Sequence, residues 1–137
     1  MDFTDFENLP DYDTPCYSSF YDEKDGILSP VRHWCLVGEV KEFVEYVRPR
    51  VSIKLKNGQE IIVHFYHEKT DHPTTFKWSE IKKGKTMAIL YAKRRQFMDF
   101  SIGIRQEHLD SVYIFNASLE TLFQTAAEIT NKTKKCW

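Results

Sequence analysis

The sequence predicts an all-β domain, and three observations lead to this fold class. Long segments after residue 33 alternate apolar and polar residues with the two-residue period of half-buried strands. Asn57-Gly58, a strong hairpin signal, lies between two such segments. A helical spacing of apolar residues occurs only near the C-terminal end. With 137 residues, 42% of them hydrophobic, the chain suffices for one compact domain and is too short for two ordinary ones.

The first half of the predicted barrel is a three-stranded meander. The segment 34–47 is rich in β-branched and aromatic residues, and Gly38 within it favours a bend or a bulge. Val51, Ile53 and Leu55 alternate with polar residues in the second strand. The third strand, 60–67, returns after the Asn-Gly turn, in which both positions tolerate a positive φ.

The second half is expected to continue after a polar loop at 68–76. Residues 78–83 can form one or two helical turns that end at Gly84. Lys93-Arg94-Arg95 is interpreted as a basic turn between strands. The remaining strands are expected at 86–92, 97–105 and 112–115.

The chain is expected to end in an amphipathic helix at 117–131, with Asn116 or Ser118 as its N-cap. The helix is predicted from the apolar residues Leu119, Leu122, Phe123, Ala126 and Ile129. Together the elements give the order of a five-stranded, OB-like Greek-key barrel with a short helix between strands 3 and 4. The C-terminal helix is an addition to it, and an SH3-like or other small barrel is the alternative.

The charge distribution divides the chain into an acidic arm and a basic body. Residues 1–30 contain eight acids and one base, a net charge of −7, whereas residues 31–137 contain 18 bases and 12 acids, a net charge of +6. The arm interleaves acids with aromatic residues and shows no strand or helix period. We therefore expect an irregular N-terminal arm that packs its aromatics onto the barrel, 31–116, and covers a sheet edge or a barrel end.

Composition also limits the class of protein. No apolar run approaches the roughly 18 residues of a membrane span, and the first residues do not resemble a signal peptide. Cys16, Cys35 and Cys136 form no disulfide framework. An intracellular protein, cytoplasmic or nuclear, without a membrane partner is the expectation.

The sequence offers no case for an enzyme or a cofactor. His64 and His67 would lie on opposite faces of their strand, so with His72 they do not converge into a metal site within the fold. His33 and Cys35 share a strand face, but their neighbours Trp34 and Leu36 indicate ordinary β structure. No phosphate-cradling glycine loop or nucleophile elbow is present.

Two binding functions remain. The first is a non-catalytic protein-interaction module, acting through a protein partner or by self-association, in which the acidic arm is a ligand for the basic body in cis or in trans. The alternative is single-stranded DNA or RNA binding through a basic aromatic face. For either ligand, nucleic acid or acidic peptide, the expected binding residues are Arg48, Arg50, Lys54, Lys56, Tyr66, Tyr91, Lys93, Arg94 and Arg95.

Two segments also resemble a recurring N-terminal region of fungal MYND-type zinc-finger proteins. These are Pro30-Val31-Arg32-His33-Trp34 and the run Phe97-Met98-Asp99-Phe100-Ser101-Ile102-Gly103-Ile104-Arg105. The resemblance implies that residues 132–137 begin a linker or a truncated zinc finger, with Cys136 as a possible first ligand. It further implies a domain of a larger protein, because the second cysteine and the later ligands of such a finger are not among these residues. MYND fingers are mostly protein-interaction modules, but the finger says little about what this domain does.

Overall fold

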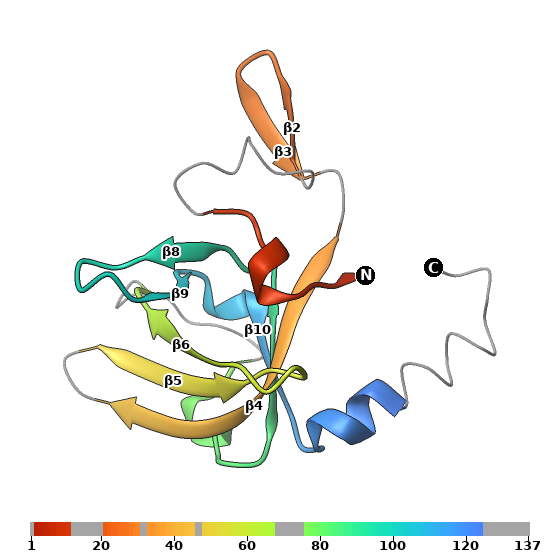
Figure 1. Ribbon diagram of the computed structural model, residues 1–137, viewed down its shortest axis with the longest axis vertical. Helices are drawn as coiled ribbons and strands as arrows, with labels where there is room; N and C mark the ends of the chain where they lie inside the picture. Colours follow the sequence, from red (N-terminus) through yellow and green to blue (C-terminus); the bar gives the residue numbers. More distant parts are fainter. Residues whose placement is uncertain (1, 12–20, 31–32, 46–47, 68–75, 125–137) are drawn as a thin grey trace.

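A computed structural model of the protein describes residues 2–11, 21–30, 33–45, 48–67 and 76–124. Its main sheet curves into a barrel, with β4, β5 and β6 as an antiparallel meander (Figure 1). The strands of this barrel are β4 (Trp34–Glu45), β5 (Pro49–Lys54), β6 (Glu60–Phe65), β7 (Thr86–Leu90), β8 (Arg94–Gln96), β9 (Ile102–Gln106) and β10 (Val112–Phe115).

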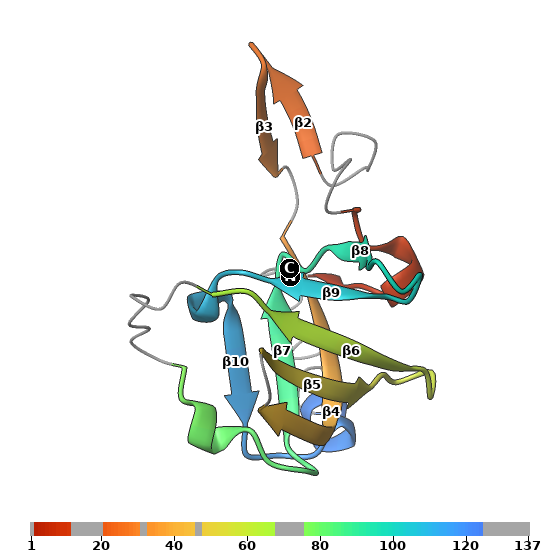
Figure 2. The ribbon, with the colours of Figure 1, turned by 90° about the vertical axis from the view of Figure 1, so that its left-hand side faces the viewer.

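The pairing of the later strands closes the barrel. β7 pairs antiparallel with both β4 and β10, whereas β9 pairs in parallel with β6 and antiparallel with β8. β7 and β8 are two halves of one barrel strand, and β9 and β10 are two halves of the next, with interruptions at 91–93 and 107–111 (Figure 2). This is the topology of a five-stranded Greek-key barrel of the OB type, so the predicted fold class is confirmed.

The first barrel strand bends as its glycine predicts. β4 pairs with β7 up to Glu39 and with β5 from Glu39 onward, and its register shifts between Val40 and Glu42. A Cβ atom on Gly38 would lie 2.9 Å from Cδ1 of Ile53. The missing side chain therefore leaves room for the Ile53 side chain at the point where β4 passes from pairing with β7 to pairing with β5.

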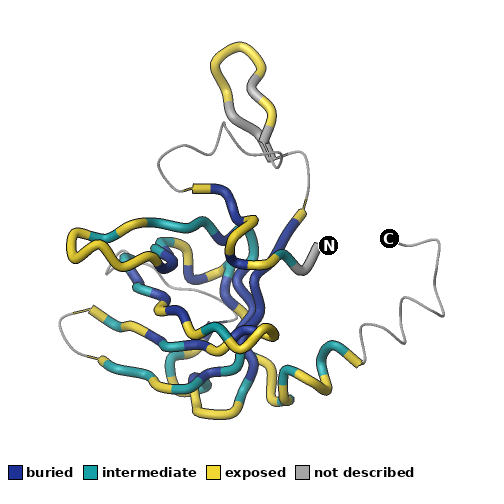
Figure 3. Tube along the Cα trace, in the orientation of Figure 1, coloured by how far each residue is buried: buried dark blue, intermediate teal, exposed yellow. Residues whose placement is uncertain are grey.

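One hydrophobic core fills the barrel, and its members come from every barrel strand except β8 (Figure 3). Trp34 is fully buried, and its indole N–H donates to the carbonyl of Ala92 at 2.8 Å. The short 3₁₀ helix η3 (Trp78–Glu80) lies between β6 and β7, where the sequence predicts helical turns. Trp78 packs there against Phe65 and Phe76 at ring-centroid distances of 5.1 and 4.7 Å.

Two sequence-based assignments in the second half are wrong. The expected basic turn at Lys93–Arg95 falls largely in β8, and the expected strand 97–105 is a turn up to Ser101, followed by β9. The Asp99 carboxylate accepts hydrogen bonds from the N–H and the hydroxyl of Ser101, at 3.0 and 2.6 Å. This side-chain-to-backbone turn overrides the alternating pattern of apolar residues.

The N-terminal arm is less irregular than expected. β1 (Asp2–Phe3) pairs in parallel with β4, and the 3₁₀ helix η1 (Phe6–Asn8) follows it. The Phe6 and Leu9 side chains are buried in the barrel core. The structure of residues 12–20, which carry several of the arm's aromatics, lies outside the described residues.

The arm also contains a hairpin that sequence reasoning missed. β2 (Tyr21–Lys24) and β3 (Ile27–Pro30) pair antiparallel and project away from the barrel (Figure 1). Asp25 and Gly26 between them both have positive φ, 55° and 79°, as in a type I′ turn. The Asp-Gly pair is the sequence signal that could have revealed it. At the predicted Asn57-Gly58 turn, by contrast, only Gly58 has a positive φ.

The predicted C-terminal helix is described over residues 119–124. Ser118 caps it, since its Oγ accepts the N–H of Thr121 at 3.2 Å. Leu119, Leu122 and Phe123 pack against a second small core on the outside of β4 and β7. The rest of the predicted helix and Cys136 lie outside the described residues, among which no helix is long and apolar enough to cross a membrane.

Candidate functional site

The outer surface of β5, β6 and β9 carries the charged and aromatic side chains that could bind a ligand. Inward-facing residues of β5 and β6, such as Val51 and Val63, are fully buried. Their neighbours in sequence point outward, because successive side chains of a strand alternate between the two faces. Register places Arg50 opposite His64, and His64 opposite Arg105. We call this surface the open face.

Tyr66, just after β6, lies at one end of the open face. The guanidinium carbons of Arg48 and Arg105 are 4.4 and 4.2 Å from the centroid of its ring. Stacking on an aromatic ring holds a guanidinium in place while leaving its N–H groups at the edge able to donate. Tyr66 therefore positions two cations. Arg105 also donates from Nε to the Glu107 carboxylate at 2.9 Å.

The middle of the open face is formed by His64 and Phe97, whose ring centroids are 4.3 Å apart. Gly103 makes room beneath them, since a Cβ atom there would lie 2.5 Å from the Ile62 carbonyl oxygen and 3.3 Å from the Phe97 ring. Burial, and then the charge of Arg50, lowers the pKa of His64 below its ordinary value of 6.5. The folded state thus favours the neutral form of the His64 ring.

The other end of the open face is the turn between β8 and β9, which projects from the barrel (Figure 1). Met98 is fully exposed, and Phe100 is 80% exposed. Phe100 has a φ of 67°, and the Phe97 N–H donates to the Ser101 carbonyl at 2.8 Å. Hydrogen bonds from Ser101 lower the pKa of Asp99, so this carboxyl stays ionised.

The structure brings together only some of the expected binding residues. Arg48, Arg50 and Tyr66 lie on the open face as described. By alternation, Lys54 lies on the same side of β5 as Arg50, at the opposite end of the strand. Arg95 is opposite Gly103 across the β8–β9 pairing and so belongs to this face.

The other expected residues point elsewhere. Tyr91 packs edge-on against Trp34 at 4.9 Å and contacts His33 through its hydroxyl. Arg94 forms an ion pair with Asp11 of the arm at 3.5 Å. Lys93 lines a small hollow beside Tyr91.

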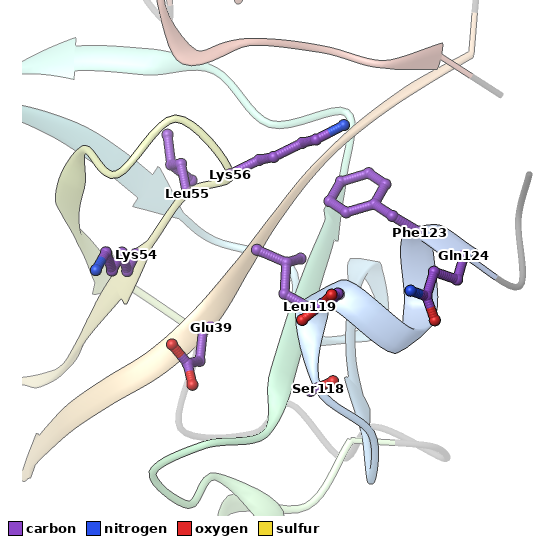
Figure 4. Close-up of a pocket in the computed structure, with 9 residues that line it drawn as sticks. Glu39, Lys54, Leu55, Lys56, Ser118, Leu119, Phe123 and Gln124 are labelled. Carbon is purple, nitrogen blue, oxygen red and sulfur yellow. The ribbon is translucent and has the colours of Figure 1, made fainter.

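Lys56 lies in a groove beside the C-terminal helix (Figure 4). This groove has a volume of about 560 Å³, and Leu55, Leu119 and Phe123 provide its apolar walls. The Lys56 ammonium is 4.8 Å from the centroid of the Phe123 ring. The groove lies at the end of β5 remote from Arg48.

Sequence reasoning missed several residues of the open face. The sequence places Arg105 in a strand but not in the expected site, and it presents His64 only as a candidate metal ligand. The alternating pattern of 97–105 predicts strand positions for Met98 and Phe100. The parallel pairing of β6 with β9, which no local pattern encodes, is what brings Arg105 beside His64.

Two observations on the described residues bear on metal ligation and on thiol chemistry. No group of three or more His, Cys, Asp or Glu side chains there could hold a metal ion. Cys35 is buried, and burial raises the pKa of its thiol to about 11. A thiol that stays protonated at neutral pH is a poor nucleophile.

Comparison with known proteins gives structural neighbours only. No family model matches the chain, and no curated protein matches it. A chain of a replication protein A heterotrimer bound to single-stranded DNA is similar over 83% of this chain and 87% of its own, with a TM-score of 0.46 and 12% identity. A chain of the S. pombe Stn1–Ten1 complex is similar over 84% of both chains, with a TM-score of 0.44 and 13% identity.

Proposed function

We propose that the protein binds single-stranded nucleic acid along the open face. The observation that carries the proposal is the placement of Arg48 and Arg105 against Tyr66, beside Arg50 and the His64–Phe97 pair. Barrels of this type bind oligonucleotides on the face of strands 2 and 3 and on the loops that flank it. Here strands 2 and 3 are β5 and β6, so the open face is the corresponding surface.

Different side chains of the open face would contact the phosphates and the bases. Guanidinium groups at the Tyr66 end would donate to phosphate oxygens, which gives affinity without reading sequence. Neutral rings suit bases, because stacking accepts any base and needs no charge. Phe97 and His64 offer such a surface in the middle of the face.

The test is fluorescence anisotropy with a labelled single-stranded oligonucleotide, as DNA and as RNA. If Arg48, Arg50 and Arg105 contact three phosphates, raising the salt from ~50 to ~200 mM should weaken binding about twentyfold. No binding to either oligonucleotide at low salt, or binding indifferent to salt, would contradict the proposal.

A second candidate function is binding of the acidic arm by the body, which is the basis of the protein-interaction hypothesis. The ion pair between Asp11 and Arg94 favours it, since it joins an acid of the arm to a base of β8. Because Phe6 and Leu9 belong to the core, deleting the arm would damage the barrel. The appropriate variant is Asp11→Asn, and sedimentation velocity over a range of concentrations tests for self-association. A chain that stays monomeric at high concentration would contradict the trans form of this function.

A further inference from the structure

The tip of the β8–β9 turn presents two large apolar side chains to solvent, and a third follows at the start of β9. Met98 is fully exposed, Phe100 is 80% exposed, and Ile102, the first residue of β9, is 56% exposed. Single exposed apolar residues are normal on protein surfaces, but a group of them on one protruding turn marks a contact site. These side chains add nothing to the core, so their position needs another explanation.

The turn is built to hold these side chains outward. Asp99 binds the N–H and hydroxyl of Ser101, and the Phe100 N–H donates to the Phe97 carbonyl at 2.9 Å. Phe100 adopts a positive φ, which costs free energy in a bulky residue. The Phe97 ring in turn rests against His64. An ordered tip loses little conformational entropy when it binds.

The tip continues the open face beyond its arginines. Arg105 lies beside His64, and moving back along β9 leads past Gly103 to Ile102 and the turn. The three strand steps from Ile102 to Arg105 span about 10 Å at roughly 3.3 Å per residue, and the turn lies beyond them. The only charge within the tip is the Asp99 carboxylate. A phosphate is therefore disfavoured at the tip, whereas an uncharged flat surface is not.

We propose that the tip stacks on the last base pair of a duplex whose single-stranded continuation lies along the open face. The ligand class would then be a junction between double-stranded and single-stranded nucleic acid. This inference rests on the proposed function. A terminal base pair is a broad, uncharged apolar surface, and Phe and Met side chains are among those that proteins place against base steps. The arginines at the far end would hold the phosphates of the single strand.

The experiment compares three labelled DNA ligands by fluorescence anisotropy with the full chain. These are a single strand, a blunt hairpin, and the same hairpin carrying that strand as a tail. The tailed hairpin is expected to bind about tenfold more tightly than the single strand, which is the gain from one added stacking contact. A 2-aminopurine base in the last pair is expected to change fluorescence on binding.

The decisive variant is Met98→Ser combined with Phe100→Asn. Asparagine tolerates a positive φ, so the turn should keep its backbone while it loses its apolar tip. The matched control is Ile27→Ser, which removes a side chain 66% exposed on the β2–β3 hairpin, away from the open face. We expect the tip variant to bind the tailed hairpin and the single strand about equally, whereas the control keeps the tenfold preference.

The outcomes separate this inference from the proposed function. Equal affinity of the unmodified protein for the single strand and the tailed hairpin would contradict recognition of a junction, but it would be consistent with single-strand binding. A junction preference that survives in the tip variant would overturn the role of Met98 and Phe100. Failure to bind any of the three ligands would contradict the proposed function itself. Thermal unfolding midpoints within a few degrees of each other would show that all the variants fold.

Discussion

The outer surface of the barrel has two regions that differ in what covers them. Outside β4 and β7, the small or apolar side chains of Cys35, Val37 and Ala88 are buried beneath the C-terminal helix. Outside β5, β6 and β9, the open face presents arginines and rings, and no helix of the described residues covers it (Figure 2). Outward-facing strand residues therefore stabilise the fold by burial on one side of the barrel, and they are exposed for ligand binding on the other.

The largest effect is expected on the covered side. Val37→Asp would bury a carboxylate beneath the helix without a partner, and it should lower the free energy of unfolding by about 3 kcal/mol. The matched change on the open face, Ser52→Asp, should cost less than about 0.5 kcal/mol, because water can still solvate the new charge. Urea denaturation measures both. Equal losses of the free energy of unfolding would contradict the claim that one region is buried and the other solvated.

A smaller loss of stability is expected where the open face depends on close backbone contact. Gly103→Ala would place a Cβ atom against the Ile62 carbonyl oxygen, and β6 and β9 would have to separate slightly. We expect a loss of about 2 kcal/mol and weaker binding of single-stranded DNA, since the Phe97 ring would move as well. Ser52→Ala is the control on the same face, and it should leave both quantities unchanged. Unaltered stability of the Gly103 variant would contradict the packing described.

The third prediction affects binding alone. Arg48→Ala and Arg50→Ala should each weaken single-stranded DNA binding by roughly tenfold and lower its salt slope by about 0.7 for the phosphate contact that is lost. Stability should change by less than about 0.5 kcal/mol. Lys82→Ala, an exposed cation near η3, is the control. An equal effect of all three changes would mean that binding depends on overall charge and not on the open face.

The smallest effect concerns pH. Because the folded state lowers the pKa of His64, the unfolded chain takes up a proton first as the pH falls below about 6.5, and stability declines there. Nucleic-acid affinity should change in the opposite direction, since a protonated His64 adds a positive charge to the open face. Urea denaturation and anisotropy at pH 7.5 and 5.5, with His64→Gln for comparison, test both directions. If stability and affinity depend on pH identically in the unmodified protein and in His64→Gln, His64 is not the group responsible.

Local sequence could predict the elements that depend on nearby residues, but not those that depend on distant ones. The period of apolar residues sufficed for the meander and the C-terminal helix, the glycine at position 38 for the bend, and the capping residue types for a helix start at Asn116 or Ser118, because these depend on neighbours in the chain. The turn at Phe97–Ser101 was missed because one carboxylate, that of Asp99, redirects the backbone against the apolar pattern. Arg105 joined the open face only through pairing between strands distant in sequence.

The most direct test of the account is to map binding on both regions at once. Backbone amide NMR spectra of the labelled protein would be recorded while a single-stranded oligonucleotide is added. We expect shifts concentrated at Arg50, His64, Phe97 and Arg105, with Val37 and Ala88 beneath the helix unchanged. Shifts concentrated beneath the helix, or no shifts at saturating oligonucleotide, would contradict the claim that the open face is the binding surface.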